Sequence, residues 1–515
     1  MISGLSIRNI RALRNSGEIP VKKINVLVGK NSSGKSTLIR LFPLLRQSVE
    51  VRTKGPILWY GRLIDFGSLR EVKSEGAGNE PVSLSFNLEL APRLSRSSKI
   101  VLKQGSARYQ LPRIVQIVLD IDEGPNDSGF VSRVELKIGE DTAVISYSSH
   151  RVKLIEINGL KFESTSEQIW FSSSERKIPV VTFLSKKAGE DGRQFYMDDR
   201  TWVTNKIASH LRIVAHGNTS IEKLRLVANQ LSYLQVDEFK SQIRGLTTAP
   251  ESLIIELMSR DVRSSFHSAL RANLLLRALP EILHEVGENF DALGKGVRYI
   301  EPLRASVERY YRLQDLAVDE IDSSGANTAM YLHSLSDQEK RRLRLWMRKS
   351  LGFYAYTEAA GGNVEIKIVV GQEKKGRNVT DLGFGYSQIL PVVLQLWHSY
   401  ERGPGRHQVD ASVVAIEQPE LHLHPSYQAL LADVFSGASE SDKAGRIIPM
   451  FIETHSEHLI NRLGALVAEK SLSRDDVQII LFEKSRGATS VKSVMFDADG
   501  VLEDSWPLGF FLPEV

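Results

Sequence analysis

A short run of glycines and hydroxylated residues near the start of the chain has the spacing of a phosphate-binding loop. Its letters, GKNSSGKS, begin at Gly29 and match the pattern G-x-x-x-x-G-K-[ST]. In such a loop the glycines let backbone N–H groups approach phosphate oxygens, the lysine neutralises the β- and γ-phosphates, and the hydroxyl binds Mg²⁺. The pattern therefore predicts binding of ATP and Mg²⁺. The predicted ATP-binding residues are Gly29, Lys30, Asn31, Ser32, Ser33, Gly34, Lys35, Ser36 and Thr37, with Ser36 also a metal ligand.

An acidic residue far along the chain is the second candidate. Residues 413–416 form a short apolar run that ends in Glu417. A carboxylate at the end of a buried strand would lie at the carboxyl edge of a sheet, where phosphoryl ligands bind in open α/β folds. An acid after an apolar strand is common in any protein, so this assignment depends on its pairing with the phosphate-binding loop. We expect Glu417 to bind Mg²⁺ through water, together with Ser36.

The residues around both motifs predict the elements that would hold them. Residues 24–28 are apolar except for Asn25 and stop at Gly29, as a buried strand does before a turn. The apolar residues between 38 and 45 predict a helix that Pro43 must kink or break. Late in the chain, short strand-like segments alternate with helical ones, which is typical of a parallel sheet. We therefore expect both chain ends to build one α/β domain.

The middle of the chain has a different character. Residues 82–90, VSLSFNLEL, alternate apolar and polar residues as a half-solvated antiparallel strand does, and similar segments continue to about residue 200. From about 204 to 350 the apolar spacing is helical, with no sustained heptads. The expected regions are an ATPase N-terminal lobe (1–90), a β-rich arm (91–203), a helical insertion (204–350) and an ATPase C-terminal lobe (351–515).

Composition excludes several classes of protein. Of the 515 residues 42% are hydrophobic and 25% charged, which is typical of a soluble globular protein. The net charge is +4, so attraction to nucleic acid would need a local patch. The chain has no cysteine, which excludes disulfides, a thiolate nucleophile and a cysteine zinc site. No apolar run approaches a membrane span and no secretory signal is evident, so we expect a cytoplasmic protein without membrane contact.

Several segments together resemble a known superfamily. They are LSIRNIRALRNSGEI with VLVGKNSSGKST, YIEPLR at residues 299–304, DLGFGYSQILPVVLQLW, AIEQPELHLHP and FIETHSEHLINRL. The chain is similar to the ABC-type ATPases of the SMC/Rad50 and OLD-like superfamily, and within it to the AAA family ATPases of bacterial anti-phage systems, such as the PtuA family of Septu. The resemblance covers the two ends of the chain and leaves residues of about 90–290 unmatched.

The resemblance implies an α/β P-loop NTPase head of ABC-ATPase type, formed from both chain ends, with a β-rich plus α-helical insertion. In that superfamily two heads close face to face on ATP, which implies a homodimer or a higher homo-oligomer. Phe384, Gly385, Tyr386, Ser387 and Gln388 would take the place of the signature loop that contacts the partner's γ-phosphate. Without the resemblance, a plain helix cap with a glycine turn remains an alternative for this segment. His455 would be the switch histidine that senses the γ-phosphate.

One departure from the superfamily pattern concerns the catalytic base. Where an aspartate and a catalytic glutamate are expected, this chain has Glu417 and Gln418. An amide cannot accept the proton of the attacking water, although Gln418 can still orient that water and Glu420 is close enough in sequence to act as a substitute base. The expected catalytic residues are thus Glu417, Gln418, Glu420 and His455. We expect ATP hydrolysis to be slow and ATP to act more as an assembly signal than as fuel.

No nuclease signature is visible in the chain, so effector chemistry would come from a partner. The resemblance to Septu suggests an HNH nuclease of the PtuB kind, acting in anti-phage defence. One alternative is an SMC/Rad50-like DNA-repair or DNA-end-binding ATPase. Another is a nucleotide-gated scaffold with negligible hydrolysis.

Other features favour structural interpretations. His422 and His424 lack a third ligand, so no zinc site is proposed. The basic run that starts at Lys340 could contact nucleic acid, but a solvated helix face is the more common explanation. Residues 497–500, DADG, are expected to form a turn. Arg304 and Arg309 are candidates either for contact with nucleotide or for structural ion pairs.

Overall fold

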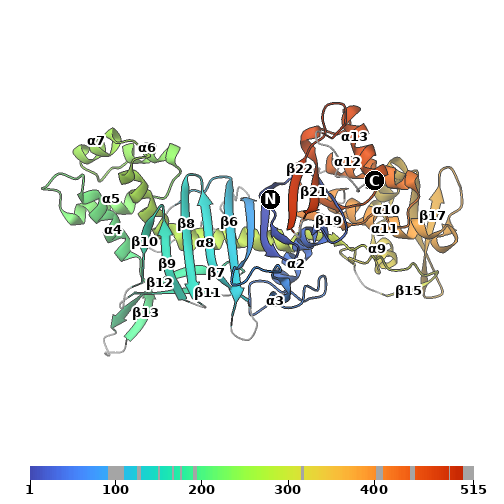
Figure 1. The fold of residues 1–515 in the computed structure, drawn as a ribbon, viewed down its shortest axis with the longest axis horizontal. Coiled ribbons are helices and arrows are strands. Elements are labelled where there is room, and N and C mark those ends of the chain that lie inside the picture. Colours follow the sequence, from blue (N-terminus) through green and yellow to red (C-terminus); the bar gives the residue numbers. More distant parts are fainter. Residues whose placement is uncertain are drawn as a thin grey trace. The chain divides into compact units, whose positions relative to one another are not determined.

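The computed structural model describes residues 1–90, 109–124, 129–148, 151–164, 168–173, 177–188, 194–314, 318–401, 410–440, 447–485 and 488–502 (Figure 1). The chain forms two compact units. The first comprises Met1–Leu5, Thr53–Ile57 and Asn79–Asp291. The second comprises Ser6–Arg52, Leu58–Gly78 and Ala292–Val515, so it contains both predicted nucleotide motifs.

An antiparallel sheet forms the body of the first unit, in the order β13-β12-β11-β9-β8-β7-β6-β5. Apolar side chains on the inner face meet across neighbouring strands, as Phe86 on β5 does with Ile117 on β6. The alternating residues of β5 are more buried than expected, because Ser83 and Ser85 are buried too and the Ser83 hydroxyl donates to Asp120. The strands are β5 (Val82–Glu89), β6 (Ile114–Glu123), β7 (Gly129–Ile138), β8 (Asp141–Ser148), β9 (Arg151–Ile157), β11 (Gln168–Ser173), β12 (Val180–Ala188) and β13 (Gln194–Asp198), with β10 (Leu160–Phe162) beside β9.

The helices expected after residue 204 follow this sheet in the chain. A long helix, α8 (Ser265–Lys295), runs behind the strands in Figure 1, and the ring of Phe290 meets that of Phe86 with centroids 5.5 Å apart. Before it come α4 (Thr201–Arg212), α5 (Ile221–Gln230), α6 (Val236–Arg244) and α7 (Glu251–Ser259). The last residues of α8 lead the chain into the second unit.

A largely parallel sheet forms the centre of the second unit, in the order β14-β19-β20-β4-β21-β22. Strand β4 (Ile24–Gly29) lies between β20 (Met450–Glu453) and β21 (Val477–Ser485), so the expectation that both chain ends build one domain is confirmed. β19 (Val413–Glu417) pairs in parallel with β20 and with β14 (Val297–Ile300). These strands are buried along their whole length except for the end of β21, as parallel strands covered on both faces are. β22 (Ala488–Val494) closes the edge in the antiparallel sense.

Helices cover this sheet and supply the rest of the core. They include α1 (Lys35–Ile39), α2 (Leu41–Glu50), α11 (Phe384–Leu396), α12 (Pro425–Glu440) and α13 (Glu457–Ala468). The break expected from Pro43 is present, since α1 ends at Ile39 and α2 begins at Leu41. Pro43 has no N–H to donate to the carbonyl of Ile39, four residues earlier, so a continuous helix would lack that hydrogen bond. Phe42 of α2 packs on Phe451 of β20 with ring centroids 4.4 Å apart.

Smaller elements complete the second unit. A separate antiparallel sheet contains β15 (Tyr311–Arg312), β16 (Phe353–Ala360), β17 (Asn363–Val370) and β18 (Arg377–Asn378). The remaining elements are α9 (Thr328–Ser334), α10 (Asp337–Leu351), α3 (Leu69–Val72), β2 (Leu13–Asn15) and β3 (Ile19–Pro20), and β1 (Ile2–Ile10) begins in the first unit and ends in the second. Among the described residues, no helix combines the length and apolar character that crossing a membrane requires.

Candidate nucleotide site

The predicted phosphate-binding loop connects β4 to α1. Two of its residues have left-handed backbone conformations, Ser32 with φ 59° and Gly34 with φ 101°. A Cβ on Gly34 would lie 2.7 Å from Cδ2 of Leu13 on β2, so only glycine fits without displacing that side chain. The loop conformation is therefore determined both by backbone geometry and by packing against β2.

Lys35 lies inside this loop and not in solvent. Its side chain is 3% exposed, and Nζ donates to the carbonyl oxygens of Gly29 at 2.8 Å and Lys30 at 2.9 Å. Burial lowers the pKa of Lys35, and the nearby charge of Glu453 opposes that effect. The ammonium group is held where an incoming phosphate can replace two neutral carbonyl acceptors with charged ones.

Two carboxylates end adjacent parallel strands beside the loop. Glu417 of β19 is in register with Glu453 of β20, and each residue is 2% exposed. The hydroxyl of Ser36 donates to Oε1 of Glu453 at 2.9 Å, so the carboxylate in contact with this serine is that of Glu453. Burial raises the pKa of Glu453 to about 7, with the charge of Glu417 as the second cause. A positive charge at this edge would stabilise both carboxylates.

Glu417 is engaged by other side chains. Arg40 donates from Nε to Oε1 and from Nη2 to Oε2, each at 2.8 Å. The hydroxyl of Tyr299 on β14 donates to Oε1 at 2.7 Å. Hydrogen bonding to Glu417 raises the pKa of Arg40, and burial raises the pKa of Tyr299. Both oxygens of Glu417 thus have protein partners.

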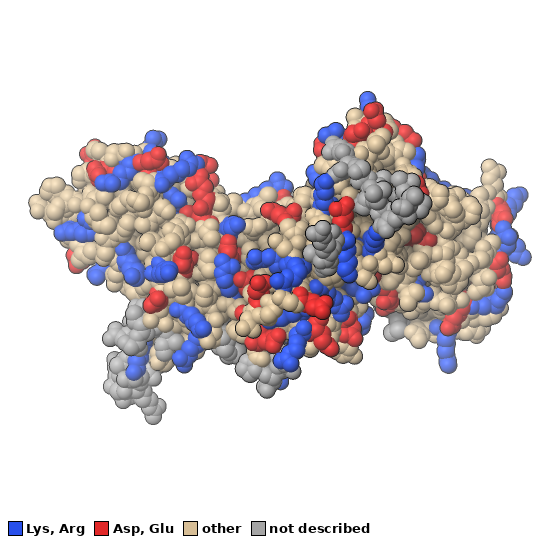
Figure 2. Space-filling view, in the orientation of Figure 1, with Lys and Arg blue, Asp and Glu red and all other residues tan. Residues whose placement is uncertain are grey.

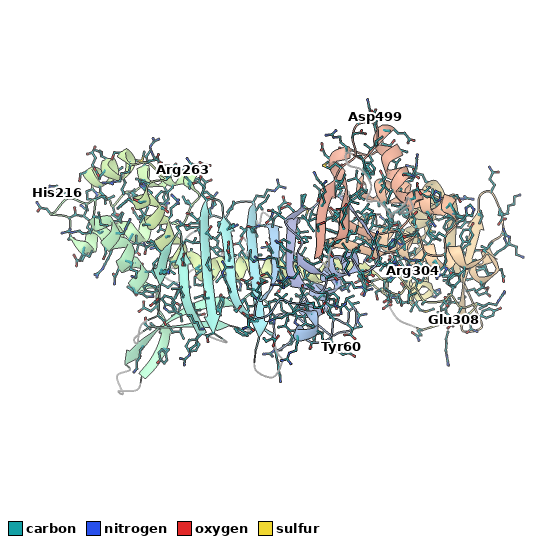
Figure 3. The ribbon with its side chains drawn as sticks, viewed as in Figure 1. Tyr60, His216, Arg263, Arg304, Glu308 and Asp499 are labelled. Atoms are coloured by element: carbon teal, nitrogen blue, oxygen red, sulfur yellow. The ribbon has the colours of Figure 1, made fainter. Side chains whose placement is uncertain are left out.

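Gln418 turns the chain out of the sheet in a left-handed conformation, with φ 44°. Its N–H donates to the carbonyl of Glu453 at 2.8 Å, which ties the ends of β19 and β20 together. Arg304, labelled in Figure 3, donates from Nη2 to the carbonyl oxygens of Glu417 and Gln418, both at 3.1 Å. A left-handed conformation of a residue other than glycine costs on the order of 1 kcal/mol, and these hydrogen bonds offset that cost.

Arg304 and Arg309, for which the sequence allowed either a contact with nucleotide or a structural ion pair, both have partners within the protein. Arg304 is 7% exposed, and burial lowers its pKa to about 10. It holds the carbonyls of the turn after β19. Arg309 forms an ion pair with Asp381. Neither contact involves the phosphate-binding loop.

Glu420 and His455 are linked through the backbone. Oε1 of Glu420 accepts a hydrogen bond from the N–H of His455 at 2.6 Å, and burial raises the pKa of Glu420. The side chain of His455 is exposed, while partial desolvation, followed by the charge of Lys35, lowers its pKa. Glu420 therefore joins the turn after β19 to the turn after β20, and His455 is mainly neutral at pH 7.

The segment predicted to act as a signature loop begins α11. Gly383 precedes it with φ 92°, and Phe384 is 50% exposed, with its ring against His422 at a centroid distance of 5.1 Å. Ser387 donates to the carbonyl of Phe384 within the same helix at 2.5 Å. The others are placed as follows: Gly385 is half-buried, Gln388 is buried, and the hydroxyl of Tyr386 lies 2.7 Å from that of Tyr427.

His422 and His424 have the structural contacts expected of them. His424 lies 2.9 Å from the hydroxyl of Ser426 through Nδ1, while His422 packs on Phe384. Across the described residues, no group of three or more histidines and acids is arranged to hold a metal ion. A magnesium ion bound with a nucleotide needs fewer side chains, since phosphates and water supply its other ligands.

The residues beside the loop fit such an ion. Glu453 is buried, and in the described part of the structure its Oε2 has no hydrogen-bond partner. Ser36 lies directly against the other oxygen of this carboxylate. An unpartnered buried carboxylate oxygen and an adjacent hydroxyl are oxygen donors of the kind that Mg²⁺ prefers.

Glu453 and Arg40 are residues of the site that were not predicted from the sequence. Glu453 has the same signal as Glu417, an acid at the end of an apolar strand, and it lies two residues before the predicted His455. Arg40 has no such signal, because an arginine after a short helix is common. Its role depends on the break between α1 and α2 and on the neighbouring end of β19.

Comparisons with known proteins define the class. The family model described as AAA ATPase domain matches residues 1–460, so the chain belongs to this family of ATPases. The match confirms the predicted α/β P-loop ATPase fold class. A comparison with curated proteins found no match.

Solved structures of SMC heads are among those similar to this chain. An Smc head bound to the C-winged helix domain of ScpA is 11% identical with TM-score 0.34, and the match covers 96% of this chain and 97% of that chain. An Smc head with an extended coiled coil, bound to the C-terminal domain of ScpA, from Pyrococcus furiosus has the same identity and TM-score, over 96% of each chain. The SMC head domain of Thermotoga maritima is 8% identical with TM-score 0.35, over 95% and 98%.

Proposed function

We propose that this ATPase binds ATP with Mg²⁺ at the loop between β4 and α1, hydrolyses it slowly, and uses the bound nucleotide to associate with a second copy. The observation that carries the proposal is the position of the loop beside two strand-end carboxylates. Ser36 contacts one of them, and the lysine of the loop is buried among its carbonyls. This combination of donors and acids suits a magnesium–triphosphate complex.

Each side chain has a role in the proposal. Lys35 would exchange the carbonyls of its own loop for phosphate oxygens, and the loop N–H groups would donate to the same phosphates. Ser36 and a strand-end carboxylate beside it would hold Mg²⁺, which neutralises phosphate charge when bound. His455, neutral and exposed after β20, would contact the γ-phosphate.

Slow hydrolysis follows from the residues after β19. Gln418 occupies the position expected for a general base, and its amide can orient water but cannot accept a proton. Glu420 is the substitute base considered from the sequence, but it is 8% exposed and its Oε1 accepts from the N–H of His455, which leaves a buried Oε2 as its one unpartnered oxygen among the described residues. A bound nucleotide should therefore persist long enough to act as a signal.

Nucleotide binding and turnover are tested together. Calorimetry should detect uptake of ATP with Mg²⁺ by the full chain, and phosphate release should be slow compared with nucleotide dissociation. Phosphate release at background level with intact ATP binding would favour the alternative of a nucleotide-gated scaffold. Absence of ATP binding in Mg²⁺ would overturn the proposal.

Association would use the start of α11, where exposed Phe384 follows a glycine turn. The first N–H groups of a helix lack intrahelical partners and favour an anion presented by another molecule. Sedimentation should show a dimer or higher oligomer with ATP or a nonhydrolysable analogue. F384E, which adds a negative charge at this helix start, should prevent association while the ATP affinity of the monomer, measured at a concentration too low for association, stays unchanged. Association of F384E at wild-type strength would exclude this surface.

We further propose, from the resemblance of the motifs, that the ATP-bound oligomer regulates a partner HNH nuclease in anti-phage defence. Purification from the native host should then recover a stoichiometric nuclease, and K35A should show whether that association needs nucleotide. Recovery of DNA without a nuclease would favour the DNA-repair alternative.

The structure offers less support for nucleic acid as the partner. Arg344 and Arg348 of the basic run on α10 lie over the ring of Tyr354, at 4.9 and 5.0 Å from its centroid. On the described part of the face drawn in Figure 2, basic and acidic side chains are interspersed. A steep fall of DNA affinity with salt would argue for the repair alternative despite this.

A further inference from the structure

The carboxylate of Glu453 is placed differently from that of Glu417. It lies at the end of β20, directly beside β4, whereas β19 is one strand further from the loop. Its Oε1 accepts the hydroxyl hydrogen of Ser36 at 2.9 Å. Its Oε2 is buried and, within the described residues, has no hydrogen-bond partner. A buried carboxylate oxygen without a partner is costly unless a ligand completes it.

In contrast to Glu453, Glu417 has hydrogen-bond partners on both of its carboxylate oxygens. Arg40 occupies both of its oxygens and Tyr299 adds a second donor to Oε1, so three hydrogen bonds of 2.7–2.8 Å hold it. Direct contact with a metal ion would compete with these hydrogen bonds, two of which are charge-assisted. Arg40 also neutralises the charge that would attract the ion.

We propose that Glu453, together with Ser36, is the side-chain pair that binds the Mg²⁺ accompanying ATP, and that Glu417 is kept from direct contact with the ion by Arg40 and Tyr299. The inference rests on the proposed function, because it assigns a role within the same nucleotide site. The acid one strand closer to the loop takes the direct contact, and Glu417 maintains the arrangement of β19, β14 and α1.

The test compares ATP affinity in EDTA with ATP affinity in Mg²⁺ for the full chain and for isosteric variants. In EDTA, the affinity reports the contacts of the protein with ATP in the absence of the metal ion. The ratio of the affinity in Mg²⁺ to the affinity in EDTA reports how much the metal ion contributes to ATP binding. For E453Q we expect affinity in EDTA that is unchanged or higher, because a negative charge near the phosphates is removed, and loss of about tenfold or more of the enhancement by Mg²⁺. For E417Q we expect most of the enhancement to remain.

The outcomes separate this inference from the proposed function. Failure of the wild-type chain to bind ATP in both conditions would overturn the proposed function. If the wild type binds ATP more tightly in Mg²⁺ and E453Q keeps this enhancement, the inference alone would be overturned. The same holds if E417Q loses as much of the enhancement as E453Q does. Circular dichroism checks that each variant is folded. If E453Q does not fold, E453D, which keeps the charge but shortens the side chain, should still lose part of the enhancement.

A double-mutant cycle gives an independent readout. If Ser36 and Glu453 bind the same ion, S36A and E453Q together should reduce the enhancement no more than the stronger single variant does. Additive losses would contradict a shared ion.

Discussion

Arg40 and Glu417 form a two-point ion pair, with both nitrogen–oxygen distances 2.8 Å, between the C-terminal end of α1 and the end of β19. The carboxylate is 2% exposed and the arginine side chain 32% exposed. The pair therefore connects the helix after the phosphate-binding loop to the strand that carries the predicted catalytic residues. A change in this contact should affect both stability and the site.

R40M should destabilise the second unit. It removes both guanidinium hydrogen bonds and leaves a buried carboxylate with Tyr299 as its remaining donor, at a cost of about 3 kcal/mol. R40M combined with E417Q should recover much of this loss, because no uncompensated charge is left. Urea unfolding measures both, and R462A, which breaks the more exposed ion pair with Asp433, is the control with an expected cost of at most about 1 kcal/mol. Equal costs for R40M and R462A would contradict this account.

K35A should lower ATP affinity by at least about 100-fold, or about 2.7 kcal/mol. The reason is the loss of the only buried cation among the described residues of the loop, where phosphate charge would be placed. K23A is the matched control, since Lys23 precedes β4 at its opposite end and pairs with Asp476 at 2.8 Å. Calorimetric titration with ATP should show a lower affinity for K35A than for the wild type, and the wild-type affinity for K23A. A loss in K23A of comparable size would indicate unfolding of the sheet.

Q418E should accelerate ATP hydrolysis by about 100-fold or more, because a carboxylate can accept the proton that an amide cannot. The two side chains have the same length, so the left-handed turn and the hydrogen bond to Glu453 should remain. Phosphate release under saturating ATP measures the rate, with E457Q on the exposed start of α13 as control. Unchanged hydrolysis in a variant that binds ATP normally would exclude residue 418 as the position of the base.

The first unit should lose stability as the pH falls from about 7 to about 5. His267 is fully buried, its Nδ1 lies 2.9 Å from the carbonyl of Asp261, and burial lowers its pKa, with nearby Arg271 adding to the effect. Because its pKa in the unfolded chain is about 6.5, the unfolded state takes up the proton first and stability falls below that pH.

Hydrogen exchange of α8 amides near His267 measures this effect. Protection should fall with pH in the wild type, and H267Q should be less stable at neutral pH but less sensitive to acid. H216Q changes a histidine that is exposed between α4 and α5, as Figure 3 shows, and should behave as the wild type. The same sensitivity in H267Q and wild type would assign the effect to another group.

Local sequence predicted much of the second unit. The apolar run before Gly29, the glycines of the loop and the apolar run before Glu417 are short-range signals, and each corresponds to the strand or turn that it predicts. The break at Pro43 was also predictable, because a proline lacks the N–H that a continuous helix needs. These signals depend on backbone chemistry within a few residues.

A P-loop, an acid at the end of an apolar run and an amide where a base is expected are properties of residue type and spacing, so they follow from the sequence. Which acid contacts Ser36 depends instead on how distant segments fold together. Three parallel strands from distant parts of the chain lie in the order β19-β20-β4, so the carboxylate beside the loop is that of Glu453. Glu417, one strand further, instead meets Arg40 and Tyr299, and no spacing along the chain encodes that difference.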